Sequence, residues 1–249
     1  SDRLPLSRWR AALPLLGDAL RYTVSPLTVW TAALALALFR FAGVGLPESE
    51  TRTLKIILAA ALLARLAAIG GMFLINTPKH DAGAVSMLSG DEAYGMSRAL
   101  RTRDVVLGVA TNQYDYFVAY DEYGSNSYVS RLTLIQLLFG PTPYSMRLLN
   151  AVLFLIGAVL LFRAAREGFG PLPAAGGLIV MLFVPTLFYW SISLLKEPLY
   201  LLGGTLVITG AAAPGVRERM SASFATLAGL AIVTDLRQGA FALTVLGLS

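Results

Sequence analysis

Long apolar runs alternate with short polar breaks along most of the chain. The first two runs cover residues 24–46 and 54–76, and each is long enough to cross a bilayer as a helix. After a mixed segment the apolar runs return in quick succession, at 144–162, 174–190, 194–213, 222–234 and 240–249. The pattern predicts an all-α, polytopic transmembrane helical bundle, with one long loop at about 77–143 that carries amphipathic juxtamembrane helices.

The first 23 residues have a different pattern from the runs that follow. Between residues 5 and 21, arginines are mixed with Trp9 and several leucines. This mixture is typical of an amphipathic helix that lies in the membrane interface rather than across the bilayer. We therefore divide the chain into an interfacial segment, 1–23, and a transmembrane domain, 24–249.

Composition agrees with a membrane protein. Of the 249 residues, 56% are hydrophobic and 14% are charged, whereas a soluble domain carries about 25% charged residues. The chain has no cysteine, which excludes disulfides and thiolate metal sites. Its net charge of +5 is assigned to Lys and Arg at helix ends that hold the topology, so no nucleic-acid partner is expected.

The short loops indicate an orientation. Arginines follow the 144–162 run and the 194–213 run, and the excess of Lys and Arg in cytoplasmic loops puts both loops inside. The 77–143 loop, the stretch from Tyr189 to Glu197 and the turn Asp235–Arg237 then lie outside.

The 24–46 run leaves a choice of topology. The basic N-terminal segment also belongs inside by the same rule, which makes 24–46 a re-entrant hairpin. Otherwise the N-terminal segment lies outside and 24–46 crosses once. Pro26 and Arg40 within the run are compatible with a kinked or partial span.

The external side collects the ionisable residues. These are the neighbours Lys79 and His80, the pair Asp91 and Glu92, the pair Lys196 and Glu197, and Arg237. Ionisable groups at membrane depth usually face a cavity, the bundle interior or one another. Structural roles remain open for some of these residues: Lys196 and Glu197 as a local ion pair, and His80 as a loop residue. Three arginines within the apolar runs, Arg40, Arg65 and Arg147, could likewise be partners within the bundle.

The stretch SGDEAYGMSRAL, residues 89–100, gives the sharpest functional hypothesis. Asp91 and Glu92 could simply begin a helix, as cap and first-turn acid. However, apolar residues follow them in a helical pattern that favours the membrane surface. A carboxylate held where a lipid headgroup meets the mouth of a bundle is suited to act as a general base on an incoming hydroxyl or amine. A nearby Lys or Arg could then stabilise a departing phosphate.

Several stretches in order resemble the GT-C superfamily of membrane glycosyltransferases, in its protein O-mannosyltransferase and aminoarabinose-transferase-like branch. They are ALLARL, SGDEAYGMSRAL, the FG to RLLN passage in YVSRLTLIQLLFGPTPYSMRLLN, LFYWSISLLKEPLYLLG and TDLRQGA, between about residues 54 and 239. The resemblance departs from the family at Gln238, where a proline usually follows the arginine. Residues 1–46 are a second departure, because they precede the first family-like helix. Family members are usually several hundred residues longer, so we expect the chain to be incomplete at its C-terminus.

The resemblance implies a polyprenyl-phosphate-linked sugar as donor and transfer with inversion on the non-cytoplasmic face. Asp91 would be the catalytic base and Glu92 would shape the acceptor site, while Arg237 and Lys196 would contact the donor phosphate. By location, we add Glu197, Tyr94, Lys79 and His80 as candidate substrate-binding residues. No cofactor is implied, and no cluster with metal-ligand spacing supports a divalent metal.

Three functions compete at this point. The first is a lipid-linked sugar transferase in a bacterial inner membrane, with its active site towards the periplasm. The second is a non-catalytic GT-C-like subunit that packs with partner membrane subunits and serves as a scaffold. The third is a transporter, which we rank last because its polar residues should lie in broken helices at mid-membrane rather than at one face.

Overall fold

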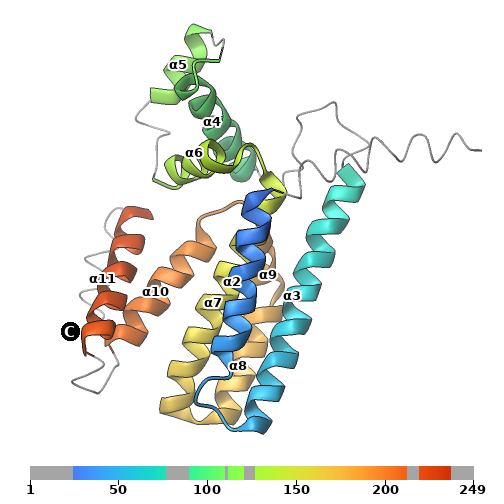
Figure 1. The fold of residues 1–249 in the computed structure, drawn as a ribbon, viewed down its shortest axis with the longest axis vertical. Helices are drawn as coiled ribbons and strands as arrows, with labels where there is room; N and C mark the ends of the chain where they lie inside the picture. Colours follow the sequence, from blue (N-terminus) through green and yellow to red (C-terminus); the bar gives the residue numbers. More distant parts are fainter. Residues whose placement is uncertain (1–24, 77–89, 110–111, 121–126, 212–218, 237–249) are drawn as a thin grey trace, which may run out of the picture.

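Every regular element in the described part of the chain is an α-helix (Figure 1). The computed structural model describes residues 25–76, 90–109, 112–120, 127–211 and 219–236. The helices are α2 (Pro26–Ala42), α3 (Glu48–Asn76), α4 (Gly90–Val106), α5 (Gln113–Tyr120), α6 (Ser127–Phe139), α7 (Pro143–Phe169), α8 (Pro171–Phe183), α9 (Pro185–Ile192), α10 (Glu197–Ala211) and α11 (Arg219–Leu236). The prediction of an all-α fold is confirmed for these ranges.

The described residues contain two to three candidate membrane spans. Glu48–Phe73 of α3 and Pro143–Phe169 of α7 are long and apolar enough to cross a membrane alone. The predicted 174–190 run is instead a pair of helices, α8 and α9, bent by 60° at their junction. The pair is either one broken span or a re-entrant loop, and the break lies before Pro185, which cannot donate the backbone bond that would continue the helix. The remaining apolar helices, such as α2 with 17 residues and α10 with 15, are shorter than the roughly 20 residues of a full span.

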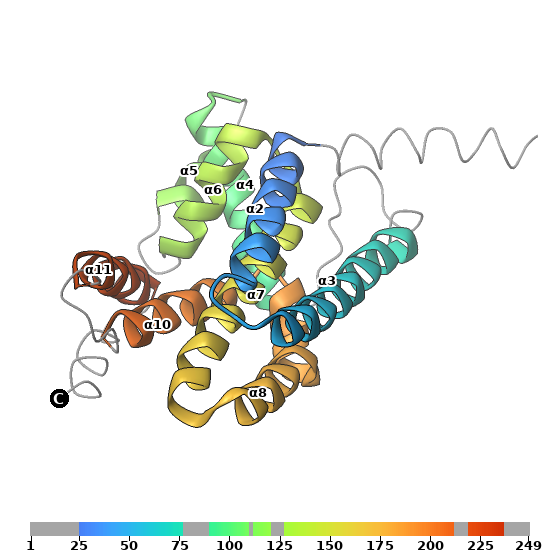
Figure 2. The same cartoon turned by 60° about the horizontal axis from the view of Figure 1, so that its bottom comes forward.

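Helix α7 is the centre of the bundle, and α2, α3 and α8 stand beside it (Figures 1 and 2). Half of the most apolar window of α7 is buried inside the protein, against 22% for the corresponding window of α3. The core between these helices contains the small residues Ala61, Ala158 and Ala174. Leucine and phenylalanine occupy most of its other buried positions. Within the described residues, most of the surface of α3 is therefore uncovered, whereas α7 is packed on several sides.

Helix α2 runs alongside α7 in the same direction. At the upper end in Figure 1, Ser25 Oγ donates to Ser145 Oγ at 3.0 Å. At the lower end, Arg163 Nη1 donates to the Val44 carbonyl at 2.8 Å. Within the 24–46 run, Pro26–Ala42 therefore forms one continuous helix rather than the two arms of a re-entrant hairpin. Ser25, the first described residue, lies at the end where α7 begins, whereas the predicted interfacial segment lies outside the described residues.

The charged ends of the helices agree with the predicted grouping of loops. Arg166 near the end of α7 forms a bidentate ion pair with Glu50 near the start of α3, with N–O distances of 2.6 and 3.1 Å. At the opposite end, Arg131 of α6 pairs with Asp235 of α11. The basic last turn of α7 and the start of α3 thus share the lower end of the bundle, and α6 of the predicted outer loop shares the upper end with Asp235.

Helices α4, α5 and α6 form a helical arm on the upper end of the bundle (Figure 1). Met96 and Ala99 of α4 and Leu132 of α6 are buried at its base against Met146 of α7 and Leu194. The prediction that the 77–143 segment carries helices is confirmed where the structure describes it, and this apolar base fixes the start of α4 over the start of α7.

Helices α10 and α11 form a close antiparallel pair with glycines at the contact. A Cβ atom at Gly229 would lie 2.5 Å from the Gly203 carbonyl oxygen and 2.8 Å from the Val207 nitrogen. A Cβ atom at Gly204 would meet no atom within 4 Å. Small residues let helix backbones approach in this way within membranes.

We expect Gly229→Ala to separate this pair, since its methyl group meets backbone rather than a flexible side chain. Overpacking of this kind costs roughly 1–3 kcal/mol. The measurement is the free energy of unfolding in mixed detergent micelles, with Gly204→Ala as the matched control. Equal stability of the two variants would contradict the close contact.

Candidate functional site

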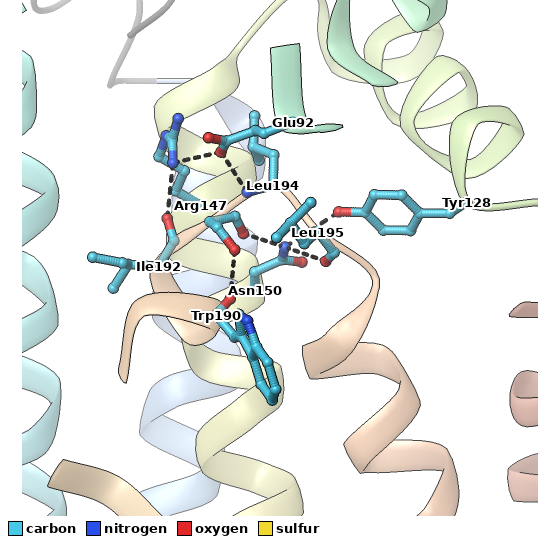
Figure 3. Close-up of polar contacts among 9 residues, drawn as sticks. Glu92, Tyr128, Arg147, Asn150, Trp190, Ile192, Leu194 and Leu195 are labelled. Carbon is cyan, nitrogen blue, oxygen red and sulfur yellow. Dashed lines mark hydrogen bonds and ion pairs between the residues drawn. The ribbon is translucent and has the colours of Figure 1, made fainter. Parts of the chain in front are cut away.

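The candidate site surrounds the connection between α9 and α10, residues 193–196, at the upper end of the bundle (Figure 3). Helix ends leave backbone N–H and C=O groups without helical partners. In an apolar surrounding these groups must be satisfied by the protein itself. Three polar side chains from distant parts of the sequence, Glu92, Arg147 and Asn150, do this here.

Glu92 and Arg147 form a buried ion pair across α4 and α7. Both side chains are fully buried, and Arg147 Nη1 lies 2.6 Å from Glu92 Oε1. The same carboxylate oxygen accepts the Leu194 N–H at 2.5 Å, and Arg147 Nη1 donates to the Ile192 carbonyl at 3.0 Å. The pair therefore ties the start of α4 and the start of α7 to the α9–α10 connection.

Asn150 also forms hydrogen bonds to the α9–α10 connection. It lies one turn after Arg147 on α7, and its Nδ2 donates to the Ser193 carbonyl at 2.8 Å and the Leu195 carbonyl at 3.2 Å. The Tyr128 hydroxyl oxygen of α6 lies within the same reach, at 3.3 Å. The arm and the bundle thus meet on one polar network inside an otherwise apolar contact (Figure 3).

The buried Tyr128 phenol stays protonated. Burial raises its pKa above its usual range, and the charges of Glu197 and Glu92 raise it further, while the hydrogen bond from Asn150 acts in the opposite direction. A protonated phenol keeps its O–H as a donor, so Tyr128 can supply a hydrogen bond to a carboxylate or to a bound hydroxyl.

Asp91 and Tyr94 are the exposed members of the predicted acidic stretch. Both lie on the first turns of α4, directly beside the buried Glu92, and Tyr94 is 54% exposed. The Tyr94 hydroxyl accepts a hydrogen bond from the buried Arg98 at 2.9 Å. Residues 91 and 94 are three positions apart, so the carboxylate and the ring share one face of the helix.

Lys196 and Glu197 do not form the local ion pair that the structural reading allowed. Lys196 is exposed, and within the described residues neither of the two makes an ion pair. The Glu197 Oε2 atom is buried and has no hydrogen-bond partner in the described part of the chain. Since Lys196 lies two residues after Leu194, the contact between Glu92 and Leu194 brings this pair to the start of α4.

The other predicted site residues lie outside the described residues. These are Lys79, His80 and Arg237. Over the described ranges, no group of three or more His, Asp or Glu side chains could hold a metal ion.

Arg65 has the structural role that the sequence left open. It is fully buried in α3, and it donates to Ser191 Oγ at 2.8 Å and to the Leu182 carbonyl at 3.1 Å. Its guanidinium lies 5.2 Å from the ring centre of Phe154 and 5.0 Å from that of Phe188. The bend between α8 and α9 takes the Leu182 carbonyl out of the helical ladder, and the arginine satisfies it.

We expect Arg65→Met to lower the free energy of unfolding by about 2–4 kcal/mol, because it leaves the Leu182 carbonyl and the Ser191 hydroxyl buried without their donor. Arg40→Met is the control, since Arg40 is exposed on α2. Both are measured by unfolding in mixed micelles. If the two variants lose the same stability, the bend does not depend on Arg65.

Two members of the network, Asn150 and Tyr128, were not among the sequence-predicted site residues. Asn150 belongs to RLLN, residues 147–150, in which Arg147 and Asn150 are spaced by three positions and share one helix face. An asparagine inside an apolar run was therefore the available signal. Tyr128 had no comparable signal, because an aromatic residue in an apolar helix is most often part of the core.

Comparisons with protein-family models, with curated proteins and with solved structures gave no match.

Proposed function

We propose that this chain is a glycosyltransferase of the inner membrane, built as a GT-C-like polytopic bundle, that transfers a sugar from a polyprenyl-phosphate donor to an acceptor on the periplasmic side. The observation that carries the proposal is the contact between Glu92 and Leu194. It brings together the acidic stretch and the Lys196–Glu197 pair, which are about a hundred residues apart and which the family resemblance assigns to one site.

The exposed and buried members of this site have different roles in the proposal. Asp91 is exposed and takes the proton of the acceptor hydroxyl. The oxygen of that hydroxyl attacks the anomeric carbon at the same time. The bond from that carbon to the phosphate oxygen breaks, and the electron pair leaves with the polyprenyl phosphate. Lys196 stabilises this departing charge, because a fixed cation is most useful where negative charge develops. Attack opposite the leaving group inverts the anomeric carbon.

The buried pair acts by position in this proposal. Glu92 has no exposed surface, so it does not touch substrate but fixes Asp91 relative to residues 194–197. Glu197 lies next to Lys196, but its Oε2 atom is buried without a hydrogen-bond partner in the described part of the chain, so by the same reasoning this atom does not touch substrate. Tyr94 offers an exposed ring next to Asp91 on α4, suited to pack on the face of a sugar.

A scaffold function is the second candidate. The observation that favours it is the use of Glu92 and Arg147 in holding helices together, because a non-catalytic subunit would need the same network. In such a subunit Asp91 would act only as an acid in the first turn of α4.

The test is transfer by the purified chain in proteoliposomes. The probe is a polyprenyl-phosphate hexose labelled in the sugar, and the measurement is label transferred to acceptor together with polyprenyl phosphate released. Transfer that requires Asp91 supports the enzyme. Absence of release with every donor hexose and pentose, combined with stable co-purification of another membrane protein, would establish the scaffold instead.

A further inference from the structure

A cleft lies at the lower end of the bundle, opposite the end that carries the candidate site. It is a cleft of about 710 Å³ between α2 and α3, lined by Phe39, Glu48, Thr51, Arg52, Lys55, Ile56 and Ala59. Its base is the tight turn from α2 to α3. Thr51 Oγ1 lies 3.4 Å from both the Gly43 and the Leu46 carbonyl oxygens. A Cβ atom at Gly43 would lie 2.6 Å from the Thr51 methyl group, so turn and helix are already packed together.

The cations at this cleft are open to a ligand. Arg52 and Lys55 are exposed, and neither makes an ion pair or a hydrogen bond through its side chain within the described residues. The nearest acid along α3, Glu50, is already held by Arg166. Glu48 is the one carboxylate among the lining residues. Arg40 is a further exposed cation in the last turn of α2, the helix that contributes Phe39 to the cleft.

Along α3, positive charge is followed by apolar surface away from the lower end of the bundle. Arg52, Lys55, Ile56 and Ala59 follow one face of α3 at helical spacing, and α3 rises from the lower end. The two cations therefore lie at the end of the bundle, and Ile56, 60% exposed, and Ala59 lie deeper. Phe39 faces them from α2. A phospholipid has the same arrangement, with its phosphate at the membrane surface and its hydrocarbon chains further into the bilayer.

We propose that this cleft binds an anionic phospholipid, with the headgroup phosphate between Arg52 and Lys55 and an acyl chain against Phe39, Ile56 and Ala59. Basic pockets between membrane helices recognise anionic headgroups in this way, and juxtamembrane cations are attracted to an anionic leaflet. The site is independent of the proposed transfer reaction, because it occupies the opposite end of the bundle.

The test is lipid retention by the purified full chain in detergent, measured by native mass spectrometry. Phosphatidylglycerol and phosphatidylcholine with identical acyl chains are the probes. We expect preferential binding of phosphatidylglycerol, and we expect Arg52→Gln combined with Lys55→Gln to weaken it about 30-fold, since each surface cation contributes roughly a fivefold factor. The charge-preserving exchange, Arg52→Lys with Lys55→Arg, should stay within about threefold of the unaltered chain, because the electrostatic attraction is kept.

Two further arms separate lipid binding from misfolding of the variants and from a site for free phosphate. Glu48→Gln removes the acid of the cleft and should strengthen phosphatidylglycerol binding about fivefold, an increase that a misfolded variant could not give. Inorganic phosphate, compared with chloride at equal ionic strength, should not displace the lipid. Equal binding of the two lipids, undiminished binding by the double glutamine variant, or displacement by inorganic phosphate would each overturn the proposal.

Discussion

Asp91→Asn is expected to reduce sugar transfer by about 10²- to 10⁴-fold, the contribution of a positioned general base. The amide keeps the shape of the side chain but cannot take the acceptor proton. Donor binding should be unchanged, because in the proposed mechanism Asp91 acts on the acceptor while cations hold the donor phosphate. The effect should therefore appear in kcat, with the KM for the polyprenyl-phosphate sugar preserved.

Stability separates this result from misfolding. Asp91 is exposed at the first turn of α4, whereas its neighbour Glu92 is fully buried. The Asp91→Asn chain should therefore unfold at the same temperature as the unaltered chain. Asp104→Asn is the matched control, since Asp104 lies on the same helix and forms an ion pair with Arg103 at the surface. Full transfer activity in the Asp91→Asn chain would make the general-base assignment wrong.

The sequence predicted the helical fold well where hydrophobic runs were long. The runs at 54–76 and 144–162 correspond to α3 and α7, although both helices extend beyond the apolar stretch at the ends predicted to be cytoplasmic. Extra turns at Glu48–Thr53 and Arg163–Phe169 are polar, so hydropathy does not detect them. The Glu50–Arg166 pair joins these two helix ends, and hydropathy does not reveal such a tertiary contact.

Breaks inside apolar runs were harder to predict. Pro185 lies in the 174–190 run, but a proline in a membrane helix can be accommodated with only a small kink. At the 60° bend between α8 and α9, Arg65, more than a hundred residues away in the sequence, donates to the buried Leu182 carbonyl. Hydropathy could place Arg65 within a span, but it could not identify its partner.

The sequence identified the acidic residues of the candidate site, but it did not show which of them is exposed and which is buried. The sequence singled out Asp91 and Glu92 as an adjacent pair, and adjacent helix residues point about 100° apart. One of the two can therefore be exposed while the other is buried, but the sequence does not say which faces the bundle. The partner of Glu92 settles this, because Arg147 is fully buried on α7 and requires a carboxylate beside it.

The buried pair gives the second large expected effect. Glu92→Gln and Arg147→Met should each lower the free energy of unfolding by about 3–5 kcal/mol, since each leaves one charge buried without its counter-ion. Glutamine can still accept the Leu194 N–H, so the loss in Glu92→Gln reports the uncompensated arginine. The measurement is unfolding in mixed micelles, followed by the fluorescence of the tryptophans.

The double variant distinguishes a buried ion pair from two independent contacts. With Glu92→Gln and Arg147→Met together, no uncompensated charge remains, and replacing a buried ion pair by neutral groups of similar size is often close to neutral. We expect the double variant to be more stable than the sum of the single losses by up to about 3 kcal/mol, the upper end of coupling between residues in contact. Strict additivity would mean that the two side chains act separately.

The same three variants also test how the pair supports transfer. If Glu92 only positions Asp91, the double variant should recover part of the transfer rate as it recovers stability, because the exposed Asp91 and Lys196 are unchanged. If Glu92 were itself the proton acceptor, the double variant would be as inactive as Glu92→Gln alone, however well it folds. Rates measured below the unfolding temperature of the least stable variant therefore separate a positioning role for Glu92 from a catalytic one.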